Sequence, residues 1–291
     1  MQDVKSIEQA VFACVDGSKY SESVCDYALH IAKQLGLTLV LLNTIEHPNA
    51  SSVTNLSGNL TLGERDVLLD ELSDEDAQKN RESINHGKEI LKELKDRVAH
   101  KGYSNVIISQ RHGTLYENLK ELEDKLRVVI FGFSGMGHMQ KEDEVGSCVE
   151  NIIRDVDAPI ILVNRDYSPI KSVMVAFNGK SGSIRALEEL SSSPMLEHDI
   201  KRYVVNINND KNSSDELIAK AKEIIKDETL NCEFIQKSGE PLESILECIN
   251  KNDIDMLAIG SYSHGKLKSA LFGSLTTKLI QNVKIPLVIL K

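Results

Sequence analysis

Short apolar runs alternate with amphipathic stretches along the whole chain. Continuous apolar runs of this length are typical of strands buried on both faces, and apolar residues repeating every three to four positions are typical of helices. In the first half the pattern predicts strands over 8–15, 37–44, 106–109, 128–131 and 160–163, and helices over 19–35, 76–99, 115–122 and 145–156. Strands that alternate with helices predict a parallel sheet covered on both faces.

The second half repeats this order of elements. Its pattern predicts strands over 172–177, 203–207, 232–235, 256–259 and 287–290, and helices over 183–190, 215–226, 242–251 and 276–281. The chain is therefore expected to be an α/β protein made of two tandem, doubly wound domains. Each domain should hold a five-stranded parallel sheet with helices on both faces. We assign residues 1–167 to the first domain and 168–291 to the second, joined by a short, closely packed junction.

Small polar landmarks recur between the halves, but their spacing changes once. Asp16-Gly17 returns 162 positions later as Asn178-Gly179, whereas His112-Gly113 returns only 126 positions later as Ser238-Gly239. The first half therefore holds an insertion, which we place at about 46–74. It is rich in Ser, Asn and Gly and then in charge. A long loop or a helical arm would fit, and either a surface loop or an interaction arm would explain it.

Charge and composition exclude several classes of protein. The net charge is −10 and the pI is about 5.4, which argues against nucleic-acid and anionic-membrane partners because both need a basic face. No apolar run reaches the ~18 residues of a membrane helix. The first residues do not read as a signal sequence, and the five cysteines are odd in number without a C-x-x-C pair. We expect a soluble, cytoplasmic protein with reduced cysteines.

The strongest candidate for chemistry follows the predicted strand 256–259. A glycine-rich segment leads from this strand to a helix that opens at a small-residue pair, and its candidate ligand-binding residues are Gly260, Ser263, Gly265, Gly273, Ser274 and Thr276. Glycine lets backbone approach a ligand closely, and a helix start offers free N–H groups to an anion. A strand, a loop and a helix capped by serine would give the same pattern without any ligand.

A second candidate lies at the end of the first strand of each half. Asp16 follows one strand and Asn178 the other, where ligands bind in open α/β sheets. A carboxylate there can accept hydrogen bonds from a ribose or a base, and an amide can do so without charge. Capping of the following helix is the alternative role for both residues.

Together these residues resemble the universal stress protein family over essentially the whole chain, as two tandem family domains. The resemblance implies strand order 3-2-1-4-5, a last strand at an edge that mediates association, and binding of ATP or another adenine nucleotide. That last strand would join the two halves or pair two chains. The resemblance also implies that the base would rest against backbone at the second strand, near Thr44 and Ile207.

Both halves depart from the family signature G-x2-G-x9-G-[S/T]. In the second half Ser263 replaces the middle glycine, and Gly265 lies two residues later. The corresponding first-half residues are Gly132, Gly135, Gly146 and Ser147, with ten residues instead of nine before the last pair. That first-half loop contains Lys141-Glu-Asp-Glu144, which carries a net charge of −2 and would repel a polyanion. We therefore place the nucleotide in the second half.

Three other known motifs do not match this sequence. Gly260-x4-Gly265-Lys266 is followed by Leu267, where a Walker A loop needs Ser or Thr. Ser263 lies in a sequence similar to a nucleophile elbow, but no acid and no His follow Gly265. Ser134 lacks the closing glycine of that motif, and no His shows metal-ligand spacing. We assign no catalytic residue and no metal site.

The leading hypothesis is a cytoplasmic stress-response protein. It would bind ATP, with Mg²⁺, or another adenine nucleotide in its second domain and act by nucleotide-dependent association, with slow ATP hydrolysis at most. The alternative is a protein with decayed nucleotide sites that binds a protein or an apolar ligand, or associates with itself through edge strands. A hydrolase using Ser134 or Ser263 is a third and weaker reading.

Overall fold

A computed structural model describes residues 4–46, 62–133, 147–260 and 274–291. Its ten strands form one continuous sheet in the order β3-β2-β1-β4-β5-β10-β9-β6-β7-β8. The strands of the first half are β1 (Ala10–Cys14), β2 (Thr38–Ile45), β3 (Val106–His112), β4 (Leu126–Gly132) and β5 (Ile160–Val163). Those of the second half are β6 (Ser172–Ala176), β7 (Lys201–Ile207), β8 (Cys232–Lys237), β9 (Met256–Gly260) and β10 (Leu287–Leu290). Both halves have the expected order 3-2-1-4-5.

The last strand of each half is an internal strand of this sheet. β5 and β10 pair antiparallel, with Val288 opposite Ile161, and all other strand pairs are parallel. The five-stranded parallel sheet expected in each half is therefore confirmed, and the two sheets join into one. Of the two roles expected for the last strand, it joins the halves of one chain. Pairing the two apolar edges satisfies their backbone groups and removes both edges from solvent.

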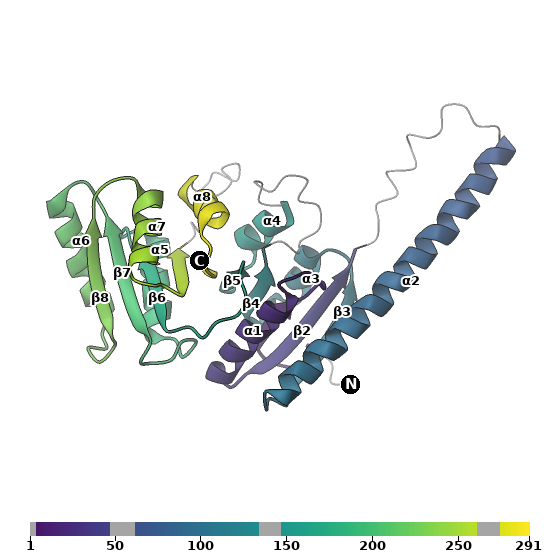
Figure 1. Ribbon diagram of the computed structural model, residues 1–291, viewed down its shortest axis with the longest axis horizontal. Coiled ribbons are helices and arrows are strands. Elements are labelled where there is room, and N and C mark those ends of the chain that lie inside the picture. The colour runs from purple at the N-terminus through teal and green to yellow at the C-terminus, as the bar shows by residue number, and fades with distance from the viewer. Residues whose placement is uncertain (1–3, 47–61, 134–146, 261–273) are drawn as a thin grey trace.

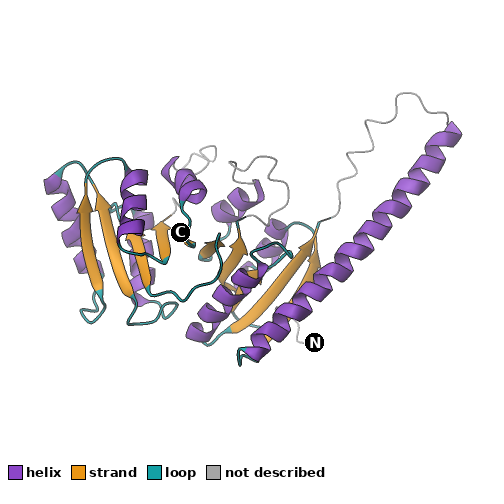
Figure 2. Cartoon of the chain, viewed as in Figure 1, coloured by secondary structure: helices purple, strands orange, loops and turns teal. Residues whose placement is uncertain are grey.

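Helices cover both faces of the sheet (Figure 2). The helices are α1 (Ser21–Leu35), α2 (Leu62–His100), α3 (Leu115–Glu121), α4 (Ser147–Asp155), α5 (Ser181–Ser192), α6 (Lys211–Ile224), α7 (Pro241–Lys251) and α8 (Ser274–Asn282). One hydrophobic core lies under α1, α2, α5 and α6, and the other under α3, α4, α7 and α8. Each core includes residues of both halves, so the halves share their packing across the β5–β10 seam.

Polar contacts also cross between the halves. The Arg127 guanidinium at the start of β4 donates to Glu189 Oε1 of α5 at 2.7 Å and to Ser193 Oγ at 3.1 Å. In the junction, the Asn164 side chain donates to the Val283 carbonyl at 2.6 Å, and the Ser168 N–H donates to the Tyr27 hydroxyl at 3.3 Å. These contacts fix the junction against both halves.

Helix α2 is longer than the pattern predicted. The structure continues it back to Leu62, so the second part of the expected insertion is helical. Gly87 of α2 and Ser214 of α6 occupy the same position of the repeat, 127 residues apart, which equates the start of α6 at Lys211 with Ile84. Residues 62–83 of α2 therefore have no counterpart in α6. At 1.5 Å per residue they are about 33 Å long, and Figure 1 shows them projecting beyond the sheet.

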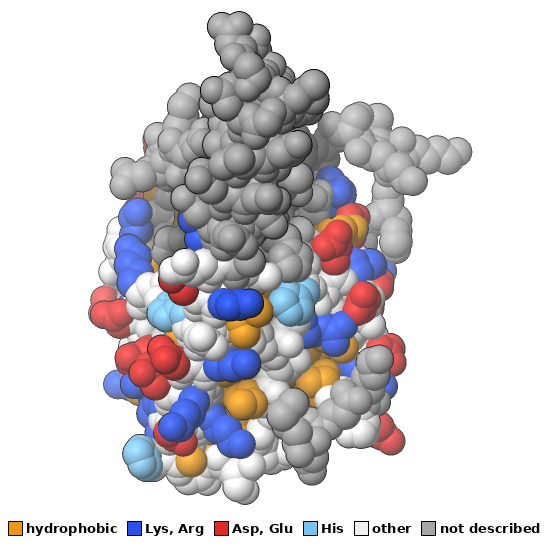
Figure 3. Space-filling model, turned by 90° about the vertical axis from the view of Figure 1, so that its right-hand side faces the viewer, with side chains coloured by type: hydrophobic (Ala, Val, Ile, Leu, Met, Phe, Trp, Pro, Cys, Tyr) orange, Lys and Arg blue, Asp and Glu red, His pale blue; other side chains and the backbone are white. Residues whose placement is uncertain are grey.

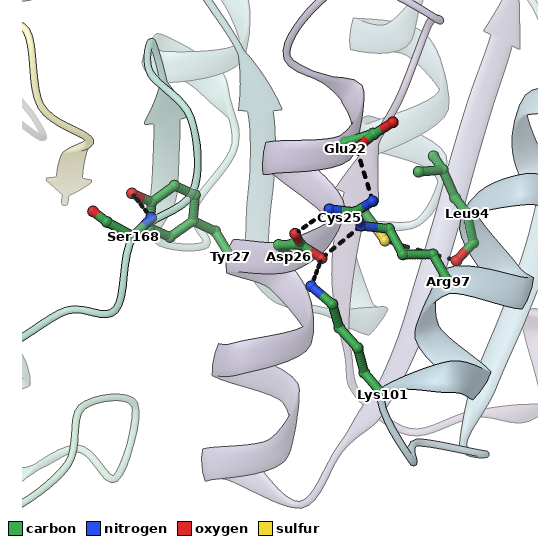
Figure 4. A network of polar contacts seen from close by, with 8 residues as sticks. All are labelled: Glu22, Cys25, Asp26, Tyr27, Leu94, Arg97, Lys101 and Ser168. Carbon is green, nitrogen blue, oxygen red and sulfur yellow. Dashed lines mark hydrogen bonds and ion pairs between the residues drawn. The ribbon is translucent and has the colours of Figure 1, made fainter.

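A charged network holds the base of α2 to α1 (Figure 4). Asp26 of α1 is 5% exposed, and its carboxylate accepts a two-pronged contact from Arg97 at 3.0 and 2.8 Å. Lys101 donates to the same carboxylate at 2.5 Å, and Glu22 pairs with Arg97 at 2.7 Å. Burial opposes ionisation of Asp26, but the two cations outweigh it and lower the pKa of this carboxyl. The network thus fixes the lower part of α2.

Candidate functional site

The candidate residues gather where the strand order of each half reverses. β1 pairs with both β2 and β4, and β6 pairs with both β7 and β9, so the chain leaves these strand ends toward opposite faces. Crevices at such points are the usual ligand sites of open α/β sheets. Figure 2 shows the arrowheads of β2, β7 and β8 at the same side of the molecule, the side from which α2 projects. Both halves therefore present carboxyl ends to this side.

Asp16 and Asn178 make the same turn in their respective halves. Asp16 Oδ1 accepts from the Ser18 N–H at 3.0 Å and from the Ser21 hydroxyl at 3.3 Å. Asn178 Oδ1 accepts from the Lys180 N–H at 3.1 Å and from the Ser183 hydroxyl at 2.9 Å. One side-chain oxygen of each residue thus shapes the turn that opens the next helix. Both side chains are exposed, and their second polar atom has no hydrogen-bond partner among the described residues.

A buried asparagine lies next to each turn, and we call it with its hydrogen-bond partners the floor of the site. Asn43 of β2 donates to the Val15 carbonyl at 2.8 Å, and Asn206 of β7 donates to the Phe177 carbonyl at 2.8 Å. Gln110 of β3 donates to Asn43 Oδ1 at 3.2 Å. The sequence shows the recurrence of Asn43 and Asn206 but gives them no role. The glutamines Gln110 and Gln236 were missed, although they also recur at the offset of 126.

Helix α2 meets this floor at Gly87. A Cβ at Gly87 would lie 2.3 Å from Asn43 Oδ1 and 2.3 Å from Gln110 Nε2. Gln110 also donates to the Ile84 carbonyl of α2 at 3.0 Å. In the second half Ser214 takes the place of Gly87, and its hydroxyl donates to Asn206 Oδ1 at 2.7 Å. The first half therefore lacks the hydrogen bond that Ser214 makes in the second half. In its place, Gly87 lets helix α2 lie close to Asn43 and Gln110.

Gly87→Ala is expected to lower the free energy of unfolding by about 1–3 kcal/mol, the usual cost of an added methylene in a packed site. The new methyl group must push α2 away from Asn43 and break the bonds of Gln110. Urea denaturation measures the loss, and hydrogen exchange should show faster opening of residues 84–90. Asn85→Ala, on an exposed position of the same helix, is the control. Equal stability of the two variants would contradict this account of Gly87.

Gly260 and Gly132 end the fourth strands of the two halves, and close packing explains the first of them. A Cβ at Gly260 would lie 1.9 Å from the carbonyl carbon of Gly182 and 2.4 Å from the Ser183 nitrogen. At Gly132 the nearest atom would be Tyr20 Cβ, at 3.1 Å. Glycine at 260 is therefore required by the start of α5, whether or not a ligand is bound.

The remaining glycines of the candidate sites lie outside the described residues. These are Gly135 and Gly146 in the first half and Gly265 and Gly273 in the second, together with Ser263 and Ser134. The helices after them begin where the pattern places the glycine–serine pairs, at Ser147 for α4 and Ser274 for α8. The first turn of α8 contains no acidic residue, whereas that of α4 contains Glu150. Because a helix start favours negative charge, α8 offers an anion the better electrostatics.

The other predicted residues lie close to these elements. Thr276 is half-buried in the first turn of α8. Thr44 and Ile207 are half-buried at the ends of β2 and β7, opposite Arg111 and Lys237 in the register. The fold thus brings Ile207 and Asn178 to neighbouring strand ends, as it does Thr44 and Asp16.

The described part of the chain gives little support for a metal site, a membrane span or a reactive thiol. No group of three or more His, Cys, Asp or Glu residues that could hold a metal ion occurs there. Likewise, none of the described helices combines the length and apolar character of a membrane span. Burial raises the pKa of the Cys14 thiol, and it raises the pKa of Cys25 to about 12. Neither thiol is activated as a nucleophile.

Known proteins share both the sequence and the fold of this chain. The model of the Universal stress protein family matches residues 9–164 and again 169–291. Universal stress protein Slr1230 of Synechocystis sp. is 25% identical over 281 residues, which cover 95% of this chain and 97% of that protein. Stress response protein NhaX of Bacillus subtilis is 33% identical over 78 residues, 27% of this chain and 47% of that protein.

Solved structures agree on the architecture. A universal stress protein from Archaeoglobus fulgidus superimposes with a TM-score of 0.69 at 20% identity, covering 98% of this chain and 96% of its own. A structure described as a putative universal stress protein, from Pseudomonas aeruginosa, gives a TM-score of 0.60 at 14% identity, covering 99% and 94%. The two family matches span both halves, and the chain belongs to the universal stress protein family as a tandem two-domain member.

Proposed function

We propose that this stress-response protein binds ATP or another adenine nucleotide at the second-half site and acts through nucleotide-dependent association. The start of α8 carries the proposal, because its first turn is free of acidic residues. It follows a segment whose residues His264 to Lys268 include two lysines and no acid. Free N–H groups, the helix dipole and local positive charge together favour phosphates.

In this proposal different residues contact the phosphates, the sugar and the base of the nucleotide. Ser274, Thr276 and the glycine segment from Gly260 to Gly273 would hold the phosphates, and Mg²⁺ would accompany these phosphates. The exposed Asn178 amide would contact the sugar, and the backbone near Ile207 would contact the base. We place the protein in the cytoplasm and expect slow ATP hydrolysis at most.

The second candidate function is binding of a protein or apolar ligand without a nucleotide. Two observations favour it. Packing against Gly182 explains Gly260 without a ligand, and Asn178 already uses its carbonyl oxygen in the local turn. The part of the face in Figure 3 that is not grey shows basic, acidic and hydrophobic side chains interspersed.

Calorimetric titration of Mg-ATP into nucleotide-stripped protein separates the two candidates. We expect binding near one equivalent, lost in Gly273→Val because the new side chain blocks close approach of the phosphates to the backbone. The matched first-half variant Gly146→Val should bind as the unmodified protein does. No heat and no thermal stabilisation at millimolar ATP would reject the nucleotide function and leave the protein or apolar ligand.

A further inference from the structure

The sheet ends in an open strand edge on the side of the first half. Among the described strands β3 pairs only with β2, and Figure 1 shows β3 at the end of the sheet beside α2. The Leu39 N–H of β2 donates to the Asn105 carbonyl at 3.0 Å, so the odd-numbered residues here bond to β2. Backbone groups point to alternate sides along a parallel strand. Those of Ile108 and Gln110 therefore point outward, where they have no partner among the described residues.

A row of three lysines on α2 borders this edge. Lys88, Lys92 and Lys95 are exposed, and none of them makes a hydrogen bond or ion pair with a described residue. A Cβ at Gly17 would lie 2.6 Å from Ile90 Cδ1, so the Ile90 side of α2 faces the middle of the sheet. The lysines lie roughly 140–160° around the helix from Ile90, on the side away from the middle. Figure 3, which views this end of the molecule, shows Lys and Arg side chains next to hydrophobic ones in the part that is not grey.

The lysine row runs alongside β3. The Ile84 carbonyl of α2 accepts from the Gln110 side chain at 3.0 Å, and the Val98 carbonyl accepts from the Tyr103 N–H at 3.2 Å. The helix rises about 21 Å from Ile84 to Val98, and an extended chain spans about 23 Å from Tyr103 to Gln110. Helix and strand thus run side by side in opposite directions, and the lysines lie between the two contacts that hold them together.

The other end of the sheet, at β8, has no such row. The corresponding positions of α6, 127 residues further on, carry one acidic, one small and one basic residue: Asp215, Ala219 and Lys222. The Lys222 ammonium lies 5.3 Å from the centroid of the Phe234 ring of β8, so it already has a partner. Three unpaired cations along an open strand are therefore specific to the first-half edge within the described part of the chain.

We propose that the β3 edge binds an extended, acidic segment of a partner protein, which adds to the sheet as a further strand. The outward N–H and C=O groups of Ile108 and Gln110 pair with the backbone of this segment. Side chains alternate between the faces of a strand, so acidic residues at every second position meet the lysine row on the α2 face. Opposite charge on the segment supplies the selectivity.

The same row disfavours a second copy of this chain as the occupant. Antiparallel pairing of two β3 edges about a two-fold axis would keep both α2 helices on one face of the sheet, with their lysine rows toward each other. Such juxtaposed like charges oppose association. The surface is also separate from the second-half nucleotide site and does not rest on it.

The probe that tests the proposal is a fluorescent, end-capped peptide of alternating Glu and Val, about eight residues long to match β3. Fluorescence anisotropy should show saturable binding, and a peptide with Gln in place of Glu should bind about tenfold more weakly. The triple variant Lys88→Gln/Lys92→Gln/Lys95→Gln, at exposed positions, should lose affinity for the Glu peptide by about the same factor. The matched second-half variant Lys222→Gln should bind as the unmodified protein does.

Hydrogen exchange distinguishes strand addition from a contact with α2 alone. The peptide should slow exchange of the Ile108 and Gln110 N–H groups and leave that of Phe234 in β8 unchanged. Unchanged exchange at Ile108 and Gln110 would overturn the proposal, as would absence of saturable binding at millimolar peptide or equal affinity of the triple variant. Gly273→Val should leave peptide binding intact, which separates this result from the nucleotide function.

Two further outcomes would assign the edge differently. Sedimentation could show that the unmodified protein self-associates with protection of the same N–H groups, and a second copy would then be the occupant. A triple variant that aggregates, from a parent that binds no peptide, would mean that the lysines only guard the edge against self-pairing. Either result would overturn the proposed partner.

Discussion

Gly260→Ala is expected to lower the free energy of unfolding by about 3 kcal/mol or more. The added methyl group would lie 1.9 Å from the carbonyl carbon of Gly182. Backbone of α5 cannot swing aside as a side chain can, so either β9 or α5 must move. Overpacking commonly costs about 1–3 kcal/mol, and contact with rigid backbone belongs at or above the upper end. Calorimetry should show a melting temperature lower by roughly 6–12 °C.

The matched control is Gly132→Ala, at the same position of the first half. Its nearest neighbour would be Tyr20 Cβ at 3.1 Å, a contact that a shift of a few tenths of an ångström relieves. We expect a loss of about 1 kcal/mol or less. If Gly260→Ala and Gly132→Ala have the same melting temperature, the close approach of α5 to Gly260 is not the reason for glycine at that position. Because Gly260→Ala perturbs the fold, it is unsuitable as a probe of nucleotide binding.

Asp26→Asn is expected to destabilise the protein by about 3 kcal/mol at pH 7, the lower end for breaking a buried ion pair. The lower end applies because Arg97 and Lys101 are 36% and 39% exposed and regain water readily. The pKa of Asp26 is lowered in the folded protein. Its ionisation therefore contributes stability above the unfolded pKa of about 3.9, and this contribution is lost as the pH falls through the folded pKa.

The pH dependence gives this prediction its signature. Urea denaturation at pH 7 should separate Asp26→Asn from the unmodified protein by the full difference, and this difference should shrink as the pH falls through the lowered pKa of Asp26. Glu188→Gln, at the equivalent but exposed position of α5, is the control and should change stability by less than about 0.5 kcal/mol. A difference between Asp26→Asn and the unmodified protein that stays constant from pH 7 to pH 2 would contradict the ionic role of Asp26.

Periodicity alone predicted every strand of the sheet. Each buried parallel strand corresponds to a short apolar run in the sequence, and turn residues separate one run from the next. It made β3 too short, ending it at Ser109. Gln110, Arg111 and His112 are polar, yet they continue the ladder opposite Asn43, Thr44 and Ile45. Polar residues at a strand end read as loop in the sequence, since only the neighbouring strand and helix show what they bond to. The strand order came from family resemblance and is confirmed.

The candidate site was harder to predict than the fold. Glycine is required both where a ligand approaches and where backbone packs, and the sequence does not distinguish Gly260 in these two roles. Asp16 and Asn178 were recognisable as caps or as ligand contacts. The structure shows a local turn instead of a cap, because one side-chain oxygen of each residue accepts from the N–H two residues on, and neither α1 nor α5 has a side-chain cap.

The antiparallel seam of β5 and β10 has a consequence for how the two halves can diverge. A homodimer built on the same seam would carry two identical sites, so any substitution would alter both together. Here the seam lies within one polypeptide, and each molecule contains one copy of either half in fixed proportion. Asp16 in one half and Asn178 in the other can thus change independently of each other. One half can lose or change its ligand while the other preserves the shared core that keeps both folded.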